Sequence, residues 1–226
     1  MAAPKHLPKP KAPSVTRLLL IRHAEVEPAY QGVFGGRIDM NLSERGHQQA
    51  KLLAKFLRGK TFDAIYASPM KRVQQTFAPS ARHHPVKQVI LRGLREIDFG
   101  DWTGFGWDAV REKFGIKPYE WLDKIELGVV PNGESTMHFR RRIEPCLRRA
   151  IRENRGKTSA IFCHGGVIRM MLAILLDLPL PKTGSFDIEY TSVTQVALHP
   201  HLNEIELLNF TPWRDLALVD GHHESK

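Results

Sequence analysis

The sequence predicts an α/β protein, a three-layer α/β/α sandwich with a mostly parallel central sheet. Short apolar runs alternate with longer segments whose apolar residues recur at helical spacing, which is the pattern of β-α-β units. The chain has 226 residues, of which 42% are hydrophobic, and this is enough to bury one sizeable core. No internal repeat is visible, so we expect a single domain over residues 17–215.

The first half of the chain is predicted to form strands and helices in turn. A short apolar run over 17–21 is typical of a buried strand, and a loop that contains several glycines follows it. A helix is expected after Ser43, whose hydroxyl can accept a hydrogen bond from a free N–H group of the first turn, and it ends before Gly59. The next expected elements are a strand over 62–66, a helix from 70 to 78 that ends at Pro79, and a strand over 86–91.

The second half begins with a segment of weak periodicity. Residues 100–133 are rich in glycine and aromatic side chains, and we expect them to form a small lid-like excursion from the sandwich. The remaining expected elements are a long basic helix over 134–155, a strand over 159–163, an apolar helix from 165 to about 177, and closing strands over 193–198 and 204–208.

Charge and composition restrict the partners and the compartment. The formal net charge is +9, which favours anionic partners such as phosphorylated small molecules. The apolar run at 170–176 is far shorter than the ~20 residues of a membrane helix, so we expect no membrane partner. Cys146 and Cys163 have no disulfide or zinc spacing, which fits a cytoplasmic location. The basic, proline-rich residues 1–16 and residues 216–226 are predicted to be disordered tails.

Two histidines directly follow predicted strands. Arg22 and His23 come after the first strand, and His164 comes after the fourth. Open α/β sheets bind ligands beyond the carboxyl ends of their strands, so the two histidines are expected to meet there. A neutral imidazole is a good nucleophile toward phosphorus, and an arginine supplies fixed charge for phosphoryl oxygens. Each of these motifs, taken alone, is better explained by a structural histidine.

Further charged residues can complete a phosphate site. Arg72 lies in the first turn of a predicted helix, where free N–H groups favour anions. Glu96, Asp98 and Asp101 lie in a segment with aromatic residues, and a carboxyl group shielded by such side chains can protonate a leaving alkoxide. Chemistry alone leaves the choice among these three carboxylates open.

Together these motifs resemble the histidine phosphatase superfamily, also called the phosphoglycerate-mutase-like family. The segment Arg22-His23-Ala24 is similar to the family's Arg-His-Gly signature, with Ala24 in the glycine position. The other segments that match family motifs in the same order are 42–50, 68–76, 94–104, 132–135 and 164–165. The resemblance covers residues 17–200, and it is closest to the branch of α-ribazole-phosphatase-like, broad-specificity phosphatases.

The resemblance implies a role for each site residue. His23 corresponds to the phosphorylated nucleophile and Glu96 to the proton donor, while Arg22, Arg72 and His164 correspond to residues that bind the phosphoryl group. It implies a metal-independent phosphomonoester hydrolase that forms a phosphohistidine intermediate. The expected substrate is a small phosphorylated metabolite, and no cofactor and no nucleic acid are expected. A homodimer is a further possibility.

The chain also departs from the family pattern. Val26 stands where many members have Ser or Thr, and Pro28 and Ala29 replace a Trp-Asn pair whose Asn helps to bind phosphate. Mutases keep that region especially well, so the departure favours hydrolysis over phosphomutase activity. Mutase activity nevertheless stays open as a second hypothesis.

Two rival hypotheses use different residues. Cys163 and Arg169 fit the Cys-x5-Arg pattern of cysteine phosphatases, also placed between a strand and a helix. The arginine-rich helix expected over 134–155 would suit a non-catalytic protein that binds polyanions. Neither hypothesis gives a task to His23, Arg72 and Glu96.

Overall fold

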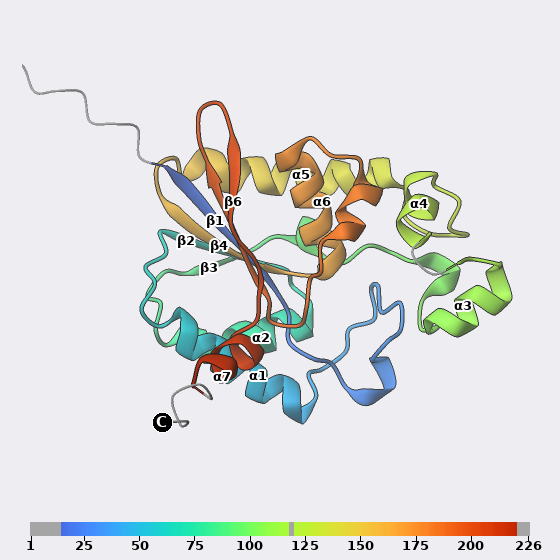
Figure 1. Ribbon diagram of the computed structural model, residues 1–226, viewed down its shortest axis with the longest axis horizontal. Coiled ribbons are helices and arrows are strands. Elements are labelled where there is room, and N and C mark those ends of the chain that lie inside the picture. The colour runs from blue at the N-terminus through green and yellow to red at the C-terminus, as the bar shows by residue number, and fades with distance from the viewer. Residues whose placement is uncertain (1–14, 118–119, 221–226) are drawn as a thin grey trace, which may run out of the picture.

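The computed structural model describes residues 15–117 and 120–220 (Figure 1). In these residues the strands are β1 (Thr16–Arg22), β2 (Ala64–Ala67), β3 (Gln88–Ile90), β4 (Thr158–Cys163), β5 (Val193–Leu198) and β6 (Asn203–Phe210). The helices are α1 (Glu44–Leu57), α2 (Lys71–Ala81), α3 (Trp107–Phe114), α4 (Trp121–Glu126), α5 (Thr136–Glu153), α6 (Gly165–Leu176) and α7 (Pro212–Asp220). Short 3-10 helices lie at Pro28–Tyr30, Arg92–Leu94, Gly100–Trp102 and Leu180–Ser185.

The strands form one sheet in the order β3-β2-β4-β1-β5-β6. β3, β2, β4 and β1 are parallel to one another, whereas β5 is antiparallel to both β1 and β6. The sheet is therefore mostly parallel, and this prediction is confirmed. In the register of β1 and β4, Arg22 lies beside Cys163, so the residues that follow the two strands emerge at the same edge.

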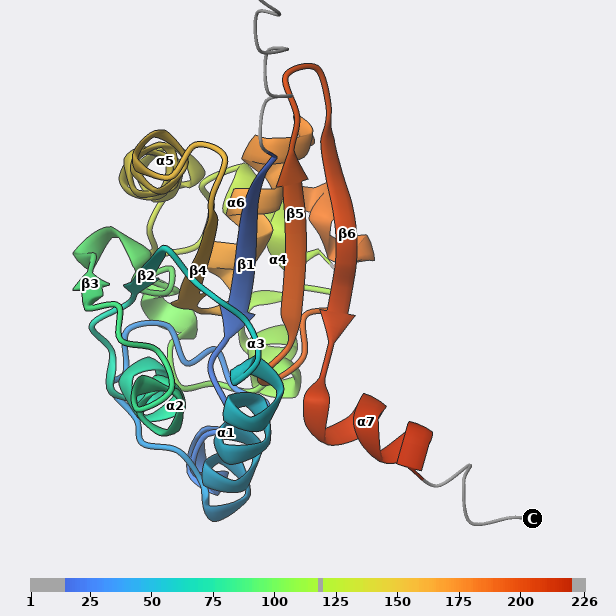
Figure 2. The same cartoon turned by 90° about the vertical axis from the view of Figure 1, so that its left-hand side faces the viewer.

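Alternating side chains of β1 separate the two halves of the core. Leu18 and Leu20 pack in a cluster that includes apolar residues of α5 and α6. Leu19 and Ile21 pack in a second cluster with residues of α1 and α2. A fully buried strand presents apolar side chains to both faces of its sheet, and this explains the continuous apolar run. Figures 1 and 2 show α5 and α6 on one side of the sheet and α1, α2 and α7 on the other.

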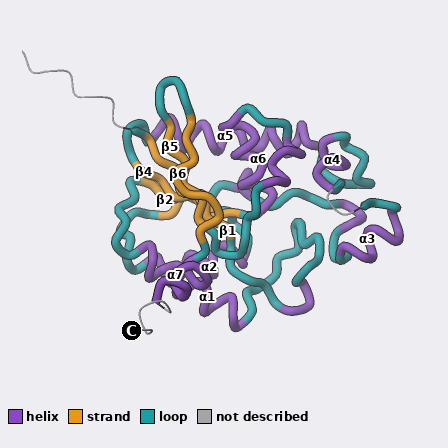
Figure 3. Tube along the Cα trace, in the orientation of Figure 1, coloured by secondary structure: helices purple, strands orange, loops and turns teal. Residues whose placement is uncertain are grey.

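The segment 100–133 leaves the sandwich at the carboxyl side of the parallel strands. Its helices α3 and α4 lie outside the two helical layers, as Figure 3 shows. Apolar residues of this segment nevertheless join the core cluster on the α5 and α6 side, among them Trp102, Val110 and Leu122. The excursion is therefore packed against the body of the protein.

The start of one predicted helix is confirmed by a hydrogen bond, and the end of another is wrong. The Ser43 hydroxyl accepts a hydrogen bond from the N–H of Gly46 at 2.9 Å, and this fixes the start of α1. One predicted end is wrong, because α2 continues through Pro79 to Ala81. Pro79 removes only one backbone donor near the end of the helix, and burial of Phe77 and Ser80 holds the last turn in place.

The predicted limits of the domain also change. Thr16 belongs to β1 and pairs with Leu198, so the domain includes a residue that was predicted to belong to the tail. Residues 1–14 lie outside the described residues. At the other end, α7 extends to Asp220, into the stretch predicted as a tail from 216. The Asp215 carboxylate accepts a hydrogen bond from the N–H of Thr211 at 2.6 Å and stabilises the start of α7. Residues 221–226 lie outside the described part of the chain.

Candidate active site

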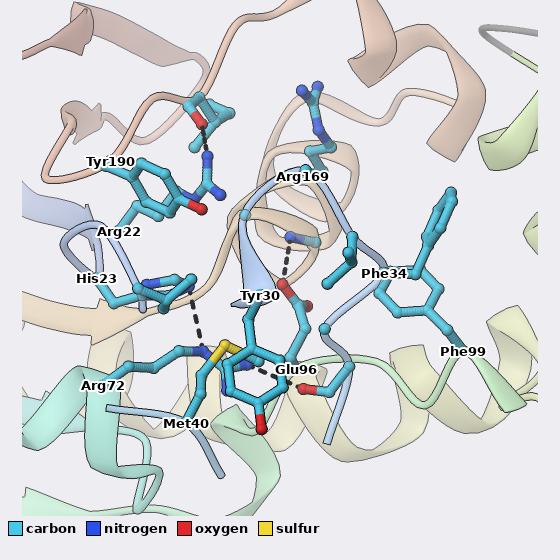
Figure 4. Close-up of a pocket in the computed structure, with 18 of the residues that line it drawn as sticks. Arg22, His23, Tyr30, Phe34, Met40, Arg72, Glu96, Phe99, Arg169 and Tyr190 are labelled. Atoms are coloured by element: carbon cyan, nitrogen blue, oxygen red, sulfur yellow. Dashed lines mark hydrogen bonds between the residues drawn. The ribbon is translucent and has the colours of Figure 1, made fainter. Parts of the chain in front are cut away.

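The sheet brings the two predicted histidines together. His23 follows β1 and His164 follows β4, and the centroids of their rings lie 5.2 Å apart. Arg72 reaches the same place from the first turn of α2, where its Nε lies 3.2 Å from His23 Nε2 and 3.2 Å from His164 Nδ1. Figure 4 shows His23, Arg72, Arg22 and Glu96 around one cavity. The structure thus gathers all five residues that the sequence singled out.

The hydrogen bonds of His23 define the state of its ring. Nδ1 lies 2.8 Å from the carbonyl oxygen of Ala24. A carbonyl oxygen only accepts, so Nδ1 carries the proton and Nε2 keeps its lone pair. Burial holds the pKa of His23 well below its usual value, and the charges of Arg72 and Arg22 lower it further. The ring is therefore neutral at physiological pH, with Nε2 directed at Arg72.

Arg72 is a buried cation fixed at all three nitrogens. Nη1 donates to the carbonyl oxygen of Ile38 at 2.7 Å and Nη2 to that of Gly36 at 2.9 Å. Its side chain borders the cavity although the residue is only 2% exposed. Burial lowers the pKa of Arg72 to about 10, so the guanidinium remains charged at neutral pH. A fixed, poorly solvated positive charge is well suited to a phosphoryl group.

His164 lies behind Arg72. It is fully buried and does not border the cavity, and its Nε2 lies 2.9 Å from the hydroxyl of Ser68. Because Nδ1 accepts from Arg72, Nε2 carries the proton and donates to Ser68. Burial holds the pKa of His164 well below its usual value, and the positive charge of Arg72 lowers it further. In this arrangement His164 orients Arg72, and direct contact of His164 with phosphate stays a prediction.

Arg22 forms another part of the cavity wall. Its Nη1 donates to the carbonyl oxygen of Ile188 at 2.6 Å, and its guanidinium carbon lies 4.2 Å from the centre of the Tyr190 ring. Its buried Nε has no hydrogen-bond partner among the described residues. An unpaired buried donor beside a cavity is an expensive arrangement that an anion would relieve.

Glu96 is the predicted carboxylate that borders the cavity. It is 8% exposed, its Oε1 accepts from its neighbour's N–H at 3.0 Å, and its Oε2 accepts from the N–H of Gly166 at the start of α6 at 3.1 Å. Asp98 instead pairs with Arg37 at 3.2 Å, and Asp101 accepts a hydrogen bond from Asn132. Of the three carboxylates left open by the sequence, Glu96 is therefore the one that the structure places at the cavity, and its role as proton donor stays a prediction.

Sequence reasoning missed most of the remaining wall. The cavity has a volume of about 340 Å³. Side chains that border it and were not assigned to this site from sequence are Val26, Tyr30, Val33, Phe34, Met40, Phe99, Trp107, Trp121, Ile188 and Tyr190, together with Arg169, which only the cysteine-phosphatase hypothesis named. Most of them lie in loops or in the excursion, where no periodic pattern indicates which side chains turn inward. The aromatic content of 100–133 was the one available signal.

The hypothesis of Cys163 as nucleophile is contradicted. Cys163 is completely buried in the core and does not border the cavity. Burial raises the pKa of its thiol far above the usual value, which opposes formation of a thiolate. Arg169 donates to the carbonyl oxygens of Thr183 and Phe186.

Within the described part of the chain, most arginines of the basic helix α5 form ion pairs, with Arg141 as the exception. Arg140 and Arg148 both pair with Glu144, and Arg149 pairs with Glu153. Arg142 points inward and pairs with Glu134. Pairing of this kind is typical of a solvated helix face and gives no support to a polyanion-binding surface.

Neither a metal-binding cluster nor a membrane-spanning helix occurs in the described part of the chain. No group of three or more His, Cys, Asp or Glu in residues 15–117 and 120–220 is arranged to hold a metal ion. No helix within those same limits is long and apolar enough to cross a membrane. Metal independence itself stays a prediction.

Comparison with known proteins supports the resemblance. Residues 18–211 match the histidine phosphatase superfamily (branch 1). The chain is 32% identical to phosphoserine phosphatase 1 of Hydrogenobacter thermophilus over 92% of this chain and 99% of that protein. It is 28% identical to the adenosylcobalamin/alpha-ribazole phosphatase of Salmonella typhimurium over 85% of this chain and 96% of that protein.

A solved structure agrees with these sequence matches. Phosphoserine phosphatase of Entamoeba histolytica, in complex with 3-phosphoglyceric acid, aligns with a TM-score of 0.72 at 27% identity. The alignment covers 87% of this chain and 98% of that chain. The shared fold, the family match and the near full-length relatives lead to one conclusion: the chain belongs to the histidine phosphatase superfamily and is a phosphatase.

Proposed function

We propose that the enzyme hydrolyses a small phosphomonoester through His23, with Glu96 as the proton donor. The observation that carries this proposal is the state of His23: neutral, protonated at Nδ1, with the Nε2 lone pair in contact with a buried arginine. Such a nitrogen is ready to attack phosphorus without first losing a proton.

In the first step, His23 Nε2 forms a bond to phosphorus while the bond from phosphorus to the ester oxygen breaks. Glu96 gives its proton to that oxygen, so the alcohol leaves neutral. Arg72 and Arg22 bind the phosphoryl oxygens, whose charge they offset during transfer. His164 supports this step by holding Arg72 in place.

In the second step, water attacks the phosphohistidine. The Glu96 carboxylate takes a proton from the water, the nitrogen–phosphorus bond breaks, and inorganic phosphate leaves. His23 returns to its neutral state and Glu96 is protonated again. Each group thus ends as it began, as turnover requires.

The relatives support a phosphorylated metabolite as the substrate. Two of them are named phosphoserine phosphatase 1 and adenosylcobalamin/alpha-ribazole phosphatase. The test is a panel of phosphomonoesters with EDTA present, in which phosphate release and isomer formation are both measured. We expect phosphate release that survives EDTA; release that needs an added divalent ion, or an isomer as the main product, would contradict the proposal.

The role of Glu96 has its own test. Glu96→Gln keeps the shape of the side chain but removes the proton donor, so alkyl phosphates with poor leaving groups should lose more rate than nitrophenyl phosphate. Equal losses for both esters would assign proton donation elsewhere. Asp98→Asn is the matched control, since Asp98 does not border the cavity, and it should affect both esters equally.

We also propose a cytoplasmic location and a homodimer. Both cysteines are free thiols, which suits a reducing compartment. Fractionation of cells and light scattering of the purified protein test the two points directly.

A further inference from the structure

The cavity at His23 lies beside a second one. The second cavity has a volume of about 640 Å³, and it shares Trp107, Trp121 and Arg169 with the wall of the first. These three side chains are therefore the ones that meet the alcohol part of a phosphomonoester when it extends from His23 toward the second cavity. The two cavities together reach the size of sites for ligands larger than a phosphorylated amino acid.

Aromatic rings line the part of the first cavity that borders the second. The ring centroids of Phe34 and Trp107 lie 4.6 Å apart, those of Trp107 and Trp121 6.1 Å, and those of Phe99 and Trp121 6.2 Å. Trp107 remains 44% exposed, so a large apolar surface faces open space. A flat ring placed here gains both apolar burial and edge-to-face contacts.

The charges along the wall suit a neutral group better than a cationic one. Arg22, Arg72 and Arg169 border the first cavity, whereas Glu96 is the one carboxylate that the described residues place there. The same part of the chain contributes no carboxylate to the second cavity. Glu96 already accepts one N–H group at each oxygen, so a substrate ammonium group would have to share this carboxylate while it lies near three arginines. The planar Arg169 guanidinium can instead stack on an aromatic ring.

We propose that Trp107 and Trp121 form a leaving-group subsite for an uncharged aromatic ring. The enzyme then prefers phosphomonoesters of alcohols that carry such a ring over those of small alkyl or amino-acid alcohols. The proposal rests on the proposed function, because it requires the phosphoryl group to lie at His23.

The test compares 2-phenylethyl phosphate with ethyl phosphate and phosphoserine. The first two are esters of unactivated primary alcohols, so the difference between their kcat/KM values measures the contribution of the aromatic ring. We expect 2-phenylethyl phosphate to be favoured over ethyl phosphate by about tenfold or more. Trp107→Ala and Trp121→Ala should each reduce this ratio toward one. Phe114→Leu is the matched control, an aromatic residue of α3 that borders neither cavity, and it should keep the ratio.

Binding of phosphonates decides the question independently of turnover. The inhibition constants of 2-phenylethylphosphonate and ethylphosphonate should differ in the same direction, and circular dichroism shows whether each variant is folded. The proposed subsite is overturned if the unchanged enzyme does not distinguish the phenyl compound from the ethyl compound. It is also overturned if both tryptophan variants keep the preference of the unchanged enzyme. Turnover that persists in His23→Ala overturns the proposed function instead, and the phosphonate ratio then still reports on the subsite.

Discussion

Arg142 on α5 holds the loop that carries Glu96. Its guanidinium donates to the carbonyl oxygens of Gly93 at 2.7 Å, Arg95 at 2.6 Å and Glu96 at 3.0 Å. It also forms a two-pronged ion pair with Glu134, with both contacts at 2.7 Å. The two charged side chains are 19% and 8% exposed, so the pair is largely shielded from water. Loss of this arginine should therefore affect both stability and catalysis.

We expect Arg142→Met to lower the free energy of unfolding by about 3 kcal/mol, the low end of the cost of breaking a buried ion pair. The low end applies because a fifth of Arg142 remains exposed and methionine keeps the apolar stem. The value for kcat/KM on alkyl phosphates should fall about tenfold, because a looser loop misplaces Glu96. Urea denaturation and steady-state kinetics measure the two effects.

The pH dependence gives a second measure of the same pair. Burial acts to raise the pKa of Glu134, but the hydrogen bonds and charge of Arg142 outweigh it and hold the pKa below its usual value. A depressed folded-state pKa contributes stability above the unfolded-state pKa, and this contribution is lost as the pH falls through the folded-state value. The stability gap between the native protein and Arg142→Met should therefore be wide at pH 7 and shrink below about pH 4.5.

A control variant on the same helix tests whether the effect is specific to Arg142 or follows from the loss of any arginine. Arg140 pairs with Glu144 at 3.2 Å, but its side chain is 49% exposed. Arg140→Met should change the free energy of unfolding by less than about 1 kcal/mol. Adding Glu134→Gln to Arg142→Met should restore part of the lost stability, since it removes a buried charge whose remaining ion pair is the longer one with Arg37 at 3.6 Å. Equal effects of the two methionine variants would refute the reasoning.

Three further predictions test the site itself. His23→Ala should reduce turnover by several orders of magnitude, whereas Cys163→Ser should keep most of it; mass spectrometry after an alkaline quench should find phosphate on the His23 peptide and not on Cys163. In Gly166→Ala, the added Cβ would lie 2.6 Å from Glu96 Oε1 and would displace this carboxylate, so turnover should fall by about tenfold or more. The melting temperature should change little, because only a flexible carboxylate must move. His23 and His164 are buried and neutral in the folded protein, and they take up protons on unfolding. As the pH falls below 6.5, each histidine should therefore lower the free energy of unfolding by up to about 1.4 kcal/mol per pH unit. A free energy of unfolding that does not change with pH in phosphate-free buffer would contradict the lowered pKa values.

The parts of the site that lie at strand ends were predictable from sequence. His23 and His164 follow apolar runs, and neighbouring parallel strands bring such residues to one edge. Arg72 was predictable for a similar reason, since it lies in the first turn of a helix after a strand. The order of the strands was not predictable, because period-two patterns show which residues are buried and leave open which strand lies next to which.

The leaving-group side of the cavity was not predictable. Tyr190 and Phe34 lie in irregular segments, and the direction of a side chain there depends on contacts made by distant parts of the chain. The orientation of His164 depends likewise on Ser68 and Arg72, neither of which is near it in sequence. Pattern reasoning placed His164 at the site, but only the three-dimensional contacts place it behind Arg72.

The position of Arg72 suggests how little the proposed reaction has to rearrange. Its Nε–H points at His23 Nε2, the atom that attacks phosphorus, while Nη1 and Nη2 are held by the carbonyl oxygens of Ile38 and Gly36. When the nitrogen–phosphorus bond forms, Nε2 no longer has a free lone pair, and the Nε–H can then be shared between His164 Nδ1, also 3.2 Å away, and a phosphoryl oxygen. The guanidinium itself can stay in place during this exchange. A charge that is fixed before the reaction, and needs no reorientation during it, stabilises the transition state more effectively than a mobile one.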